Sequence, residues 1–405
     1  MIKTIKSPHI YLPKQSVDMS KYAVIACDQY TSNLVYWDSL SEYVGDNVST
    51  LHMIYPEAYL ETTNNDEYIA NINKNIAHYL DNGDLVDIGE CFILVERVTS
   101  FNVRRLGLVL AVDLEDYSFE KGNKARIKAS EATIVERIPP RLKIRKNAPI
   151  ELPHILVLFD DKEKSIVEEL YANRDNLEKV YDFELNKDGG HIRGYKVSNT
   201  NEVIAKFDAL FNKNGNGLLF IVGDGNHSLA TAKAHWDLIK KDLNEEEKVN
   251  HPARYALVEA NNLYDEGIIF EPIHRVLFNV DDSFIDELSK ISEGEFETYI
   301  YSAKTGKKAF KMTKNAPQAY KRIQSFLDEY MSKHKEVKID FIHDEDELLS
   351  VTDKNTNSVA IKMPALTKDD LFDYIAGDMV LPRKSFSMGH ANEKRYYLEA
   401  KKITK

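Results

Sequence analysis

Residues 223–228, with the sequence Gly-Asp-Gly-Asn-His-Ser, combine residue types that can bind an anion and move a proton. They lie between an apolar run that predicts a buried strand and a stretch of residues that favour helix. The first N–H groups of a helix lack partners, and the positive end of its dipole favours an anion such as phosphate. Gly223 and Gly225 permit a ligand to approach the backbone closely. Asp224 can hold a metal ion or accept a proton, and His227 can donate to a phosphate oxygen or act as an acid or base.

The same segment also permits a purely structural interpretation. Asn226 or Ser228 can cap the predicted helix, and Asp224 can close a turn of its own backbone. The segment is not the glycine-rich dinucleotide motif, because position 228 is Ser where a final Gly is required. It is not the phosphate-binding loop of nucleoside triphosphatases either, because no Gly-Lys-Ser or Gly-Lys-Thr follows. Spacing alone leaves ligand binding and helix capping equally open.

Two later segments place cations beside hydrogen-bonding groups. Arg383, Lys384 and Ser385 follow a proline, and such a loop can neutralise phosphates. An exposed basic turn is the alternative for this loop. His274 and Arg275 directly follow a predicted strand and can meet an anion, although His274 can equally be a buried histidine of the core.

Three charged residues in the first 150 positions complete the set of candidates. Asp28 follows the apolar run at 22–27, and ligand sites in sheet-based domains tend to lie beyond strand ends. Asp28 is therefore a candidate general base, with a turn closed by its side chain as the alternative. Arg137 and Arg141 flank a pair of prolines, and they can bind an anion or pair with surface acids.

The composition excludes several classes of protein. The 405 residues include 53 Lys and Arg against 65 Asp and Glu, and the net charge of −12 disfavours binding to nucleic acid or to an anionic membrane. Two cysteines cannot make a disulfide framework, so Cys27 and Cys91 are expected to be reduced. Cys-x-x-Cys, His-Glu-x-x-His and Gly-x-Ser-x-Gly motifs are absent. Residues 1–8 lack the apolar stretch of a signal peptide, and no run approaches the ~20 apolar residues of a membrane span, so we expect a cytoplasmic protein.

The hydrophobic pattern predicts the elements that must position these residues. Strands are expected at residues 22–27, 51–55, 91–98, 106–112, 132–135, 154–159, 217–223, 255–259, 267–270, 338–341 and 358–362, with a hairpin between 91–98 and 106–112. Helices are expected at 66–80, 162–180, 201–211, 228–236, 316–331 and 368–376. Prolines 139 and 140 are expected to end any regular element. Because no strict βαβ rhythm is present, we predict an α+β fold with mixed sheets.

This pattern suggests three regions that are interlocked into one functional unit. They are an N-terminal α+β region at 1–150, a central region at 151–280 that contains the Gly-Asp-Gly-Asn-His motif, and a C-terminal α+β region at 281–405.

Six segments, in order, resemble a bacterial and archaeal family known as domain of unknown function 1015. They are residues 24–32 (Val-Ile-Ala-Cys-Asp-Gln-Tyr-Thr-Ser), 134–141 (Ile-Val-Glu-Arg-Ile-Pro-Pro-Arg), 151–154 (Glu-Leu-Pro-His), 223–227, 271–275 and 381–385. The resemblance extends over nearly the whole chain. The motif of the family is commonly Asp-Gly-His-His-Arg, which is similar to that of the ParB/sulfiredoxin superfamily. The resemblance therefore implies a ParB/sulfiredoxin-like core around the strand, turn and helix at 223–227.

That superfamily includes nucleotide-dependent kinases of free serine. The resemblance implies a kinase that uses ATP or ADP with Mg²⁺ to phosphorylate a small hydroxyl metabolite such as free L-serine. Asp224, Gly225 and His227 fall on the motif, whose turn holds nucleotide phosphates in those kinases. Asn226 replaces the first His of the motif and Ser228 replaces its Arg, which removes one cation from a phosphate site.

The kinase hypothesis assigns a role to each candidate residue. Phosphoryl transfer needs charge neutralisation and alignment more than covalent help. The expected catalytic residues are Asp28, Asp224 and His227, with Asp224 also the metal ligand. Nucleotide binding is expected at Gly223, Gly225, Asn226, Ser228, His274, Arg275, Arg383, Lys384 and Ser385, and substrate binding at Arg137 and Arg141. The loss of the motif's Arg favours an alternative, a non-catalytic regulatory protein that binds phosphate or nucleotide.

Overall fold

The computed structural model describes residues 4–60, 65–133, 135, 138–281, 283–377 and 379–405. The chain forms two compact units. The first contains Met1–Ala129, Thr133–Ile268 and His390–Lys405, and the second contains Ser130–Ala132 and Ile269–Gly389. The second unit is thus inserted in the sequence of the first, and the last residues belong to the first unit again. The division into three regions at 150 and 280 remains a prediction.

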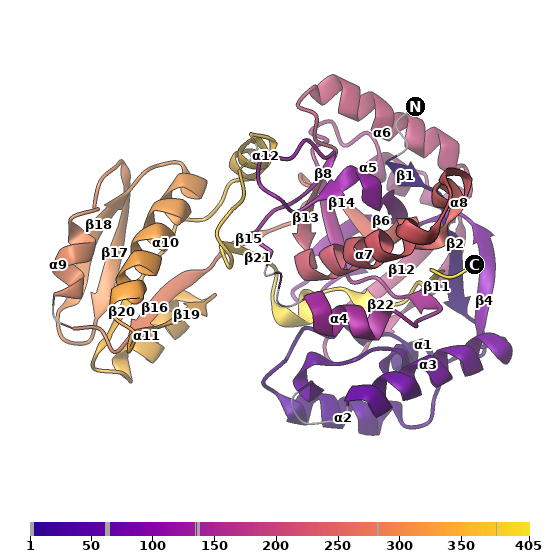
Figure 1. The fold of residues 1–405 in the computed structure, drawn as a ribbon, viewed down its shortest axis with the longest axis horizontal. Coiled ribbons are helices and arrows are strands. Elements are labelled where there is room, and N and C mark those ends of the chain that lie inside the picture. The colour runs from indigo at the N-terminus through magenta and orange to yellow at the C-terminus, as the bar shows by residue number, and fades with distance from the viewer. Residues whose placement is uncertain (1–3, 61–64, 134, 136–137, 282, 378) are drawn as a thin grey trace. The chain divides into compact units, whose positions relative to one another are not determined.

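A ten-stranded mixed sheet forms the centre of the first unit over the described residues (Figure 1). Its strands follow the order β11-β12-β5-β6-β14-β10-β13-β8-β7, and β1 pairs with β6 beside this path. Their bounds are β1 Ile5–Lys6, β5 Phe92–Val98, β6 Arg104–Asp113, β7 Tyr117–Ser118, β8 Ile127–Ala129, β10 Leu156–Phe159, β11 Glu178–Leu185, β12 Gly190–Val197, β13 Phe220–Asp224 and β14 Tyr255–Asn262. β10 is antiparallel to β13 and parallel to β14. The α+β class with mixed sheets is confirmed, whereas the ParB/sulfiredoxin-like core remains a prediction.

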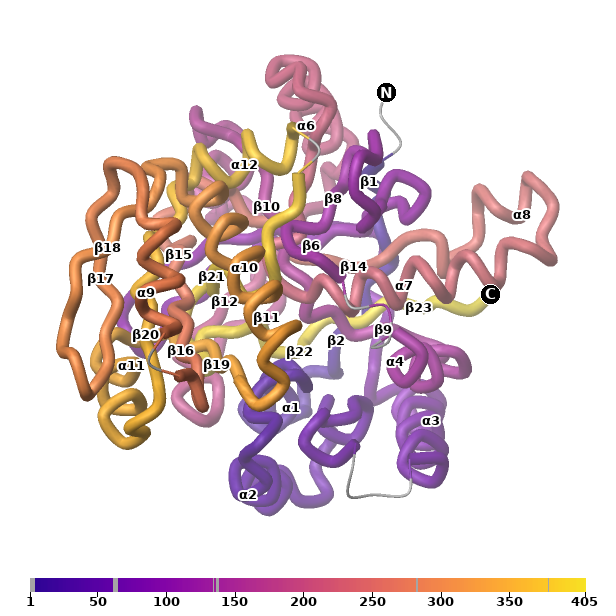
Figure 2. The backbone as a smooth tube through the Cα atoms, turned by 60° about the vertical axis from the view of Figure 1, so that its left-hand side comes forward, coloured from indigo at the N-terminus to yellow at the C-terminus, as the bar shows by residue number. Residues whose placement is uncertain are grey.

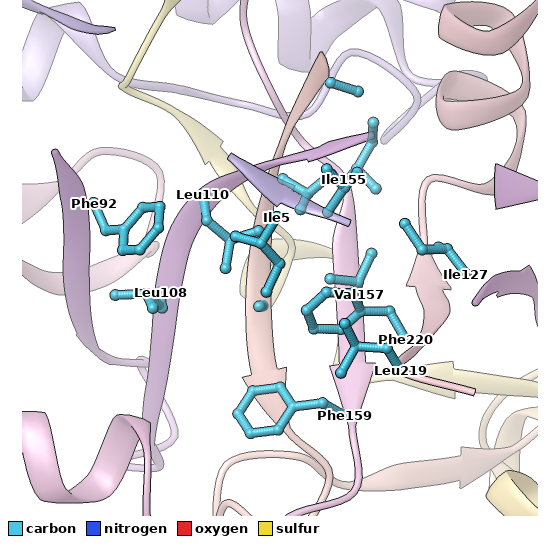
Figure 3. Close-up of a cluster of buried hydrophobic side chains, with 14 of the residues drawn as sticks. Ile5, Phe92, Leu108, Leu110, Ile127, Ile155, Val157, Phe159, Leu219 and Phe220 are labelled. Carbon is cyan, nitrogen blue, oxygen red and sulfur yellow. The ribbon is translucent and has the colours of Figure 1, made fainter. Parts of the chain in front are cut away.

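Helices cover both faces of this sheet. Successive side chains of a strand point to opposite faces, so a strand that is apolar throughout contributes to an apolar cluster on each face. In β5, Phe92 and Leu94 join one apolar cluster while Ile93 and Val95 join another. The first cluster is closed by helices α5 (Val167–Ala172), α6 (Thr200–Asn214) and α7 (Asn226–Ile239). The second is closed by helices α1 (Met19–Tyr22), α2 (Leu34–Val44) and α3 (Asn65–Asp81). Figure 3 shows part of the first cluster, with Phe159 and Phe220 extending from neighbouring strands.

Three two-stranded pairs attach further segments to the first unit. β2 (His9–Pro13) pairs with β4 (Leu85–Glu90), β3 (Val24–Ile25) with β22 (Tyr396–Tyr397), and β9 (Ile150–Glu151) with β23 (Lys401–Lys402). Helices α4 (Ile138–Arg145) and α8 (Glu245–Asn250) complete this unit among the described residues. In Figure 2 the yellow C-terminal tube passes through β22 and β23, so the last residues of the chain are built into the first unit.

The second unit contains a five-stranded antiparallel sheet in the order β18-β17-β20-β16-β19. The strands are β16 His274–Phe278, β17 Phe296–Ser302, β18 Gly306–Met312, β19 Lys338–Ile342 and β20 Ser358–Ile361. A separate pair joins β15 (Phe270–Pro272) to β21 (Phe386–Met388). The helices are α9 Phe284–Ser289, α10 Ala316–Lys333, α11 Glu345–Asp353 and α12 Lys368–Ala376. Over the described residues, no helix of either unit is long and apolar enough to cross a membrane.

Most of the predicted elements are confirmed, including the hairpin of β5 and β6. The helix predicted at 162–180 is confirmed only at Val167–Ala172 (α5), because Arg174–Asn176 form a 3₁₀ turn and strand β11 begins at Glu178 and pairs with β12. β12 in turn pairs with β5, so long-range pairing outweighs the local preference for helix. The strand predicted at 51–55 is also wrong: Thr50–Met53 is a 3₁₀ helix whose first turn is capped by Ser49.

The two prolines at 139 and 140 begin a helix, contrary to the prediction that they end one. α4 starts at Ile138, so both prolines lie in its first turn, where their missing N–H groups would have no partner in any case. The strand predicted at 132–135 includes residue 134, which lies outside the described residues, and its described neighbours 132, 133 and 135 form no strand.

A buried ionic network ties the C-terminal segment to the central sheet. The Arg395 guanidinium pairs with Glu259 of β14 and with Glu399 at 2.5 Å, and its Nε donates to Pro153 O at 3.0 Å. All three side chains in the ion pairs are at most 3% exposed. Burial raises the pKa of Glu259, but the charges of Arg395 and Arg105 outweigh it, so its pKa lies below the ordinary value.

Replacing Arg395 with Met should lower the free energy of unfolding of the first unit by about 3–5 kcal/mol, because two buried carboxylates would lose their cation. Urea denaturation followed by circular dichroism measures this change. The exposed pair of Lys143 and Asp66 provides the control, since Lys143→Met should cost less than about 1 kcal/mol.

The difference between wild type and Arg395→Met should shrink as the pH falls. A carboxyl with a lowered folded pKa stabilises the fold above its unfolded pKa, and this contribution is lost as the pH falls through the folded value. In Arg395→Met the buried Glu259 would instead favour its protonated form. A difference that stays constant from pH 7 to pH 4 would contradict the expected protonation of Glu259 in Arg395→Met.

Candidate functional site

The turn between β13 and α7 depends on a glycine. Gly225 adopts a left-handed conformation with φ +82°, and a Cβ at this position would lie 3.1 Å from the Ile155 Cα. Asp224 Oδ1 accepts from the Gly225 N–H at 2.9 Å, and no side chain caps α7 at this residue. The backbone of the turn therefore lies directly against the segment that leads into β10.

Ser228 does not cap the helix and instead contacts a histidine. In the first turn of α7, Ser228 Oγ lies 2.8 Å from His154 Nε2. His154 precedes β10, which pairs with β13, and this pairing brings the two residues together. The same Nε2 lies 3.9 Å from Asp28 Oδ2, and the His154 side chain is only 10% exposed. His154 thus joins the turn predicted from the sequence to Asp28, which lies three residues after β3.

Tyr397 orients the His154 ring from the other side. Its hydroxyl lies 2.8 Å from His154 Nδ1, and the two rings meet edge to face with centroids 5.5 Å apart. Tyr397 is placed by the pairing of β22 with β3, and the Cys27 N–H donates to its hydroxyl at 3.2 Å. Burial raises the pKa of Tyr397 well above its ordinary value, so the phenol is neutral at physiological pH. Burial also raises the pKa of the Cys27 thiol, which excludes a reactive thiolate there at neutral pH.

Asp28 is held as a carboxylate. Burial raises its pKa, but His154, a hydrogen bond from the Gln29 side chain at 3.0 Å and the charge of Lys394 outweigh that effect, so the pKa is lowered. Lys394 also forms an ion pair with Asp224, with Nζ 3.2 Å from Oδ2. One lysine from the C-terminal segment therefore acts on both acids that the sequence singled out.

A second carboxylate beside Asp28 has the opposite pKa shift. The Glu57 N–H donates to Cys27 O at 2.8 Å, and the Glu57 side chain forms an ion pair with Arg141 of α4. Burial raises the pKa of Glu57, the Arg141 charge lowers it, and the charge of Asp28 raises it, with a net increase. Two neighbouring carboxyls with pKa values pushed apart are a common basis for separate acid and base roles.

The structure thus gathers part of the predicted site in the first unit. One connected set of polar groups contains four of the predicted residues, Asp28, Arg141, Asp224 and Ser228. We call this set the α7 cluster, and its other members are Glu57, His154, Lys394 and Tyr397. Gly223, Gly225, Asn226 and His227 lie in the same turn. Arg137 lies outside the described residues.

The remaining predicted residues belong to the second unit and make contacts within it. The fully buried Arg275 donates to Ile273 O at 2.6 Å and to Lys384 O at 2.7 Å. His274 Nδ1 accepts from the Met363 N–H at 3.1 Å, and burial lowers the pKa of His274 to about 4.

The loop at 381–385 is held by a carboxylate of its own unit. Glu131 accepts from the N–H groups of Lys384 and Ser385, both at 3.1 Å, and Ser385 Oγ donates to Pro382 O at 2.6 Å. The side chains of Arg383 and Lys384 are exposed.

Sequence reasoning missed His154, Tyr397, Lys394 and Glu57. His154 belongs to the Glu-Leu-Pro-His segment that carries part of the family resemblance, and its place just before a buried strand was the available signal. Lys394 and Tyr397 follow an insertion of more than a hundred residues and lie in no motif, so only the fold brings them to the site. No group of three or more His, Cys, Asp or Glu is placed to hold a metal ion over the described residues.

A family model described as "Protein of unknown function (DUF1015)" matches residues 10–403. The chain belongs to this family. The membership inferred from six short segments is therefore confirmed, and the match includes both units of the fold. Among curated proteins, no relative matches this DUF1015 chain.

Solved structures show distant likenesses to the DUF1015 chain. A conserved hypothetical protein from Pyrococcus furiosus matches with a TM-score of 0.34 and 12% identity, over 72% of this chain and 90% of its own. A free serine kinase in complex with AMP matches with a TM-score of 0.38 and 10% identity, over 73% and 91%. SbnI with a C-terminal truncation, from Staphylococcus aureus, matches with a TM-score of 0.37 and 10% identity, over 69% and 81%.

Substituting Gly225 with Ala should destabilise the DUF1015 chain by about 2–4 kcal/mol, because the added Cβ meets Ile155 and the left-handed conformation is itself unfavourable. Gly83→Ala is the matched control, since Gly83 has φ +67° and no heavy atom within 4 Å of the added Cβ. It should cost only the backbone penalty of about 1–2 kcal/mol. Equal losses of stability for the two variants in urea denaturation would mean that the close approach of the added Cβ to Ile155 does not destabilise the fold.

Proposed function

We propose that this DUF1015 chain is a nucleotide-dependent phosphotransferase that phosphorylates a small hydroxyl metabolite, with free L-serine as the candidate acceptor. The observation that carries the proposal is the contact of Asp28, His154 and Ser228 at the first turn of α7. This contact joins an ionised acid to a helix start that suits a phosphate group.

The surroundings of this turn offer the charge neutralisation that phosphoryl transfer requires. α7 is a 14-residue helix, so its N-terminus carries the full positive end of the helix dipole. Lys394 forms an ion pair with Asp224 immediately before the helix, and Arg141 forms an ion pair with Glu57. These cations can take the place of the Arg that the motif lacks at position 228. We assign phosphate binding to residues 223–228, with His227 as a donor to a phosphate oxygen.

Asp28 is suited to receive the proton of the acceptor. In the proposed step the acceptor hydroxyl oxygen forms a bond to the terminal phosphorus of ATP or ADP, and the bond from that phosphorus to the nucleotide's bridging oxygen breaks. The shortened nucleotide carries away the electron pair, and the hydroxyl proton passes to Asp28. The lowered pKa keeps Asp28 ionised at neutral pH, so that it can accept the hydroxyl proton of the acceptor.

Asp224 is the residue we assign to Mg²⁺. Magnesium in nucleotide sites is held by one or two carboxylates together with substrate phosphates and water, so a single protein carboxylate fits this role. The ion would neutralise charge on the phosphates. Substrate contacts are assigned to Arg141 and Arg137, as predicted from the sequence.

A non-catalytic protein that binds nucleotide is the second candidate. It is favoured by Ser228, which replaces the cation of the family motif and directs its hydroxyl to His154. Such a protein would keep the phosphate-binding turn and lack turnover.

The experiment is a product assay with the purified full chain, ATP or ADP, Mg²⁺ and a panel of amino acids and hydroxy acids that includes L-serine. Mass spectrometry should detect a phosphorylated acceptor and the shortened nucleotide in equal amounts. Nucleotide that raises the melting temperature without any product would support the second candidate. No product and no thermal shift with either nucleotide would reject both.

Asp28→Asn should lower turnover by about 100-fold or more, because the proton acceptor is lost. The melting temperature should change by only a few degrees, since Asp28 lies at the edge of the core with 29% of its side chain exposed. Glu42→Gln, at an exposed position of α2, is the control and should retain full turnover. Normal turnover of Asp28→Asn would remove Asp28 from the mechanism.

A further inference from the structure

A pocket of the first unit shares no residue with the α7 cluster. Its volume is about 330 Å³, and its lining includes Lys6, Ser7, Tyr11, Tyr255, Lys401 and Lys402. Lys6 comes from β1, which pairs with β6, and Lys401 and Lys402 form β23. Tyr11 of β2 pairs with Ala400, which brings the start of the chain beside its last strand.

Three lysines give this pocket a positive charge within a protein whose net charge is −12. Lys6 Nζ lies 4.4 Å from the centroid of the Tyr255 ring, and Lys402 Nζ lies 5.5 Å from that of Tyr11. Over the described part of the chain, neither amine has a carboxylate oxygen within 4 Å. Aromatic faces hold these cations in place without neutralising them.

Lys401 adds a buried ammonium group to the lining of this pocket. Its Nζ donates to Pro252 O and Lys402 O, both at 2.9 Å, and lies 3.6 Å from Glu151 Oε1. Glu151 is shared with Arg145, so its single charge does not balance both cations. Burial lowers the pKa of Lys401 to about 8, as expected for a cation whose neutralisation is incomplete. The acid of the lining, Asp87, pairs with His9 at 3.0 Å.

Ser7 supplies an independent sign of a missing ligand. It is 7% exposed, and its hydroxyl is buried with no hydrogen-bond partner among the described residues. A buried polar group without a partner costs roughly 1–3 kcal/mol. A ligand oxygen that accepts from Ser7 would remove this cost.

We propose that this pocket binds a small organic anion that carries phosphate or carboxylate groups. Lys6, Lys402 and Ser7 contact the charged groups, and Lys401 supports them from the wall. Pro8, Ala111 and Pro252 offer apolar surface to a carbon skeleton. The volume lies at the lower end of the range for small-molecule sites, which fits a compact metabolite rather than a nucleotide. The site is separate from the proposed phosphotransferase site and does not depend on that proposal.

The test is isothermal titration calorimetry of the full chain with two probes, pyrophosphate and citrate. At least one should bind with a stoichiometry of one, and Lys6→Gln/Lys402→Gln should weaken that binding at least tenfold. The control is Lys121→Gln/Lys241→Gln, which removes the same charge from exposed positions and should change the affinity less than twofold. The probe that binds distinguishes a phosphate site from a carboxylate site. Absence of binding by both probes, or binding that Lys6→Gln/Lys402→Gln leaves unchanged, overturns the proposal.

Ser7→Ala separates ligand binding from folding. Because the Ser7 hydroxyl has no partner among the residues that the structure describes, its removal should leave the melting temperature of the free chain unchanged or raise it. The same substitution should weaken binding of the probe severalfold. Unaltered probe affinity in Ser7→Ala would remove Ser7 from the site, and a large loss of stability would mean that its hydroxyl is already satisfied.

Discussion

The buried cation of Arg395 is the interaction on which the first unit and its polar site both depend. It joins Glu259 in a central strand to Glu399 near the end of the chain, and it is nearly excluded from water. Burying three charged groups is costly unless each is matched, so this segment has one favourable position against the sheet. Lys394 precedes Arg395, and Tyr397 follows it by two residues. The ion pairs of Arg395 therefore also hold Lys394 beside Asp224 and the Tyr397 hydroxyl beside His154.

The α7 cluster is assembled from segments that are far apart in the sequence. Asp28 lies three residues after β3, His154 precedes β10, Ser228 lies in the first turn of α7, and Lys394 lies in the C-terminal segment. Its electrostatics follow from uneven burial and pairing: Asp28 is stabilised as a carboxylate, whereas Glu57 holds its proton more tightly despite Arg141. A site of this kind can present an ionised acid and several cations to a phosphate within an acidic protein.

The sequence predicted the class of the fold, the β5–β6 hairpin and the strand, turn and helix that carry Asp224 and Gly225, because these depend on local periodicity and on glycine. It failed for Glu178–Leu185, whose strand exists only because β12 is available to pair with it. It failed at Pro139 for the opposite reason, since a proline ends a helix in its interior but is accepted in its first turn. His154 and Lys394 could not be found by spacing, because their partners are brought to them by sheet pairing and by the Arg395 anchor.

The position of the inserted unit in the sequence affects the order in which the protein is made. When Ile268 has been synthesised, the ten strands of the central sheet are all present, yet Glu259 still lacks its cation. At about 5–20 residues per second, the insertion delays Arg395 by on the order of ten seconds. During that interval Glu259 lacks its ion pair with Arg395, and β3 lacks its partner strand β22. The nascent chain is thus open at the future α7 cluster until its final segment arrives.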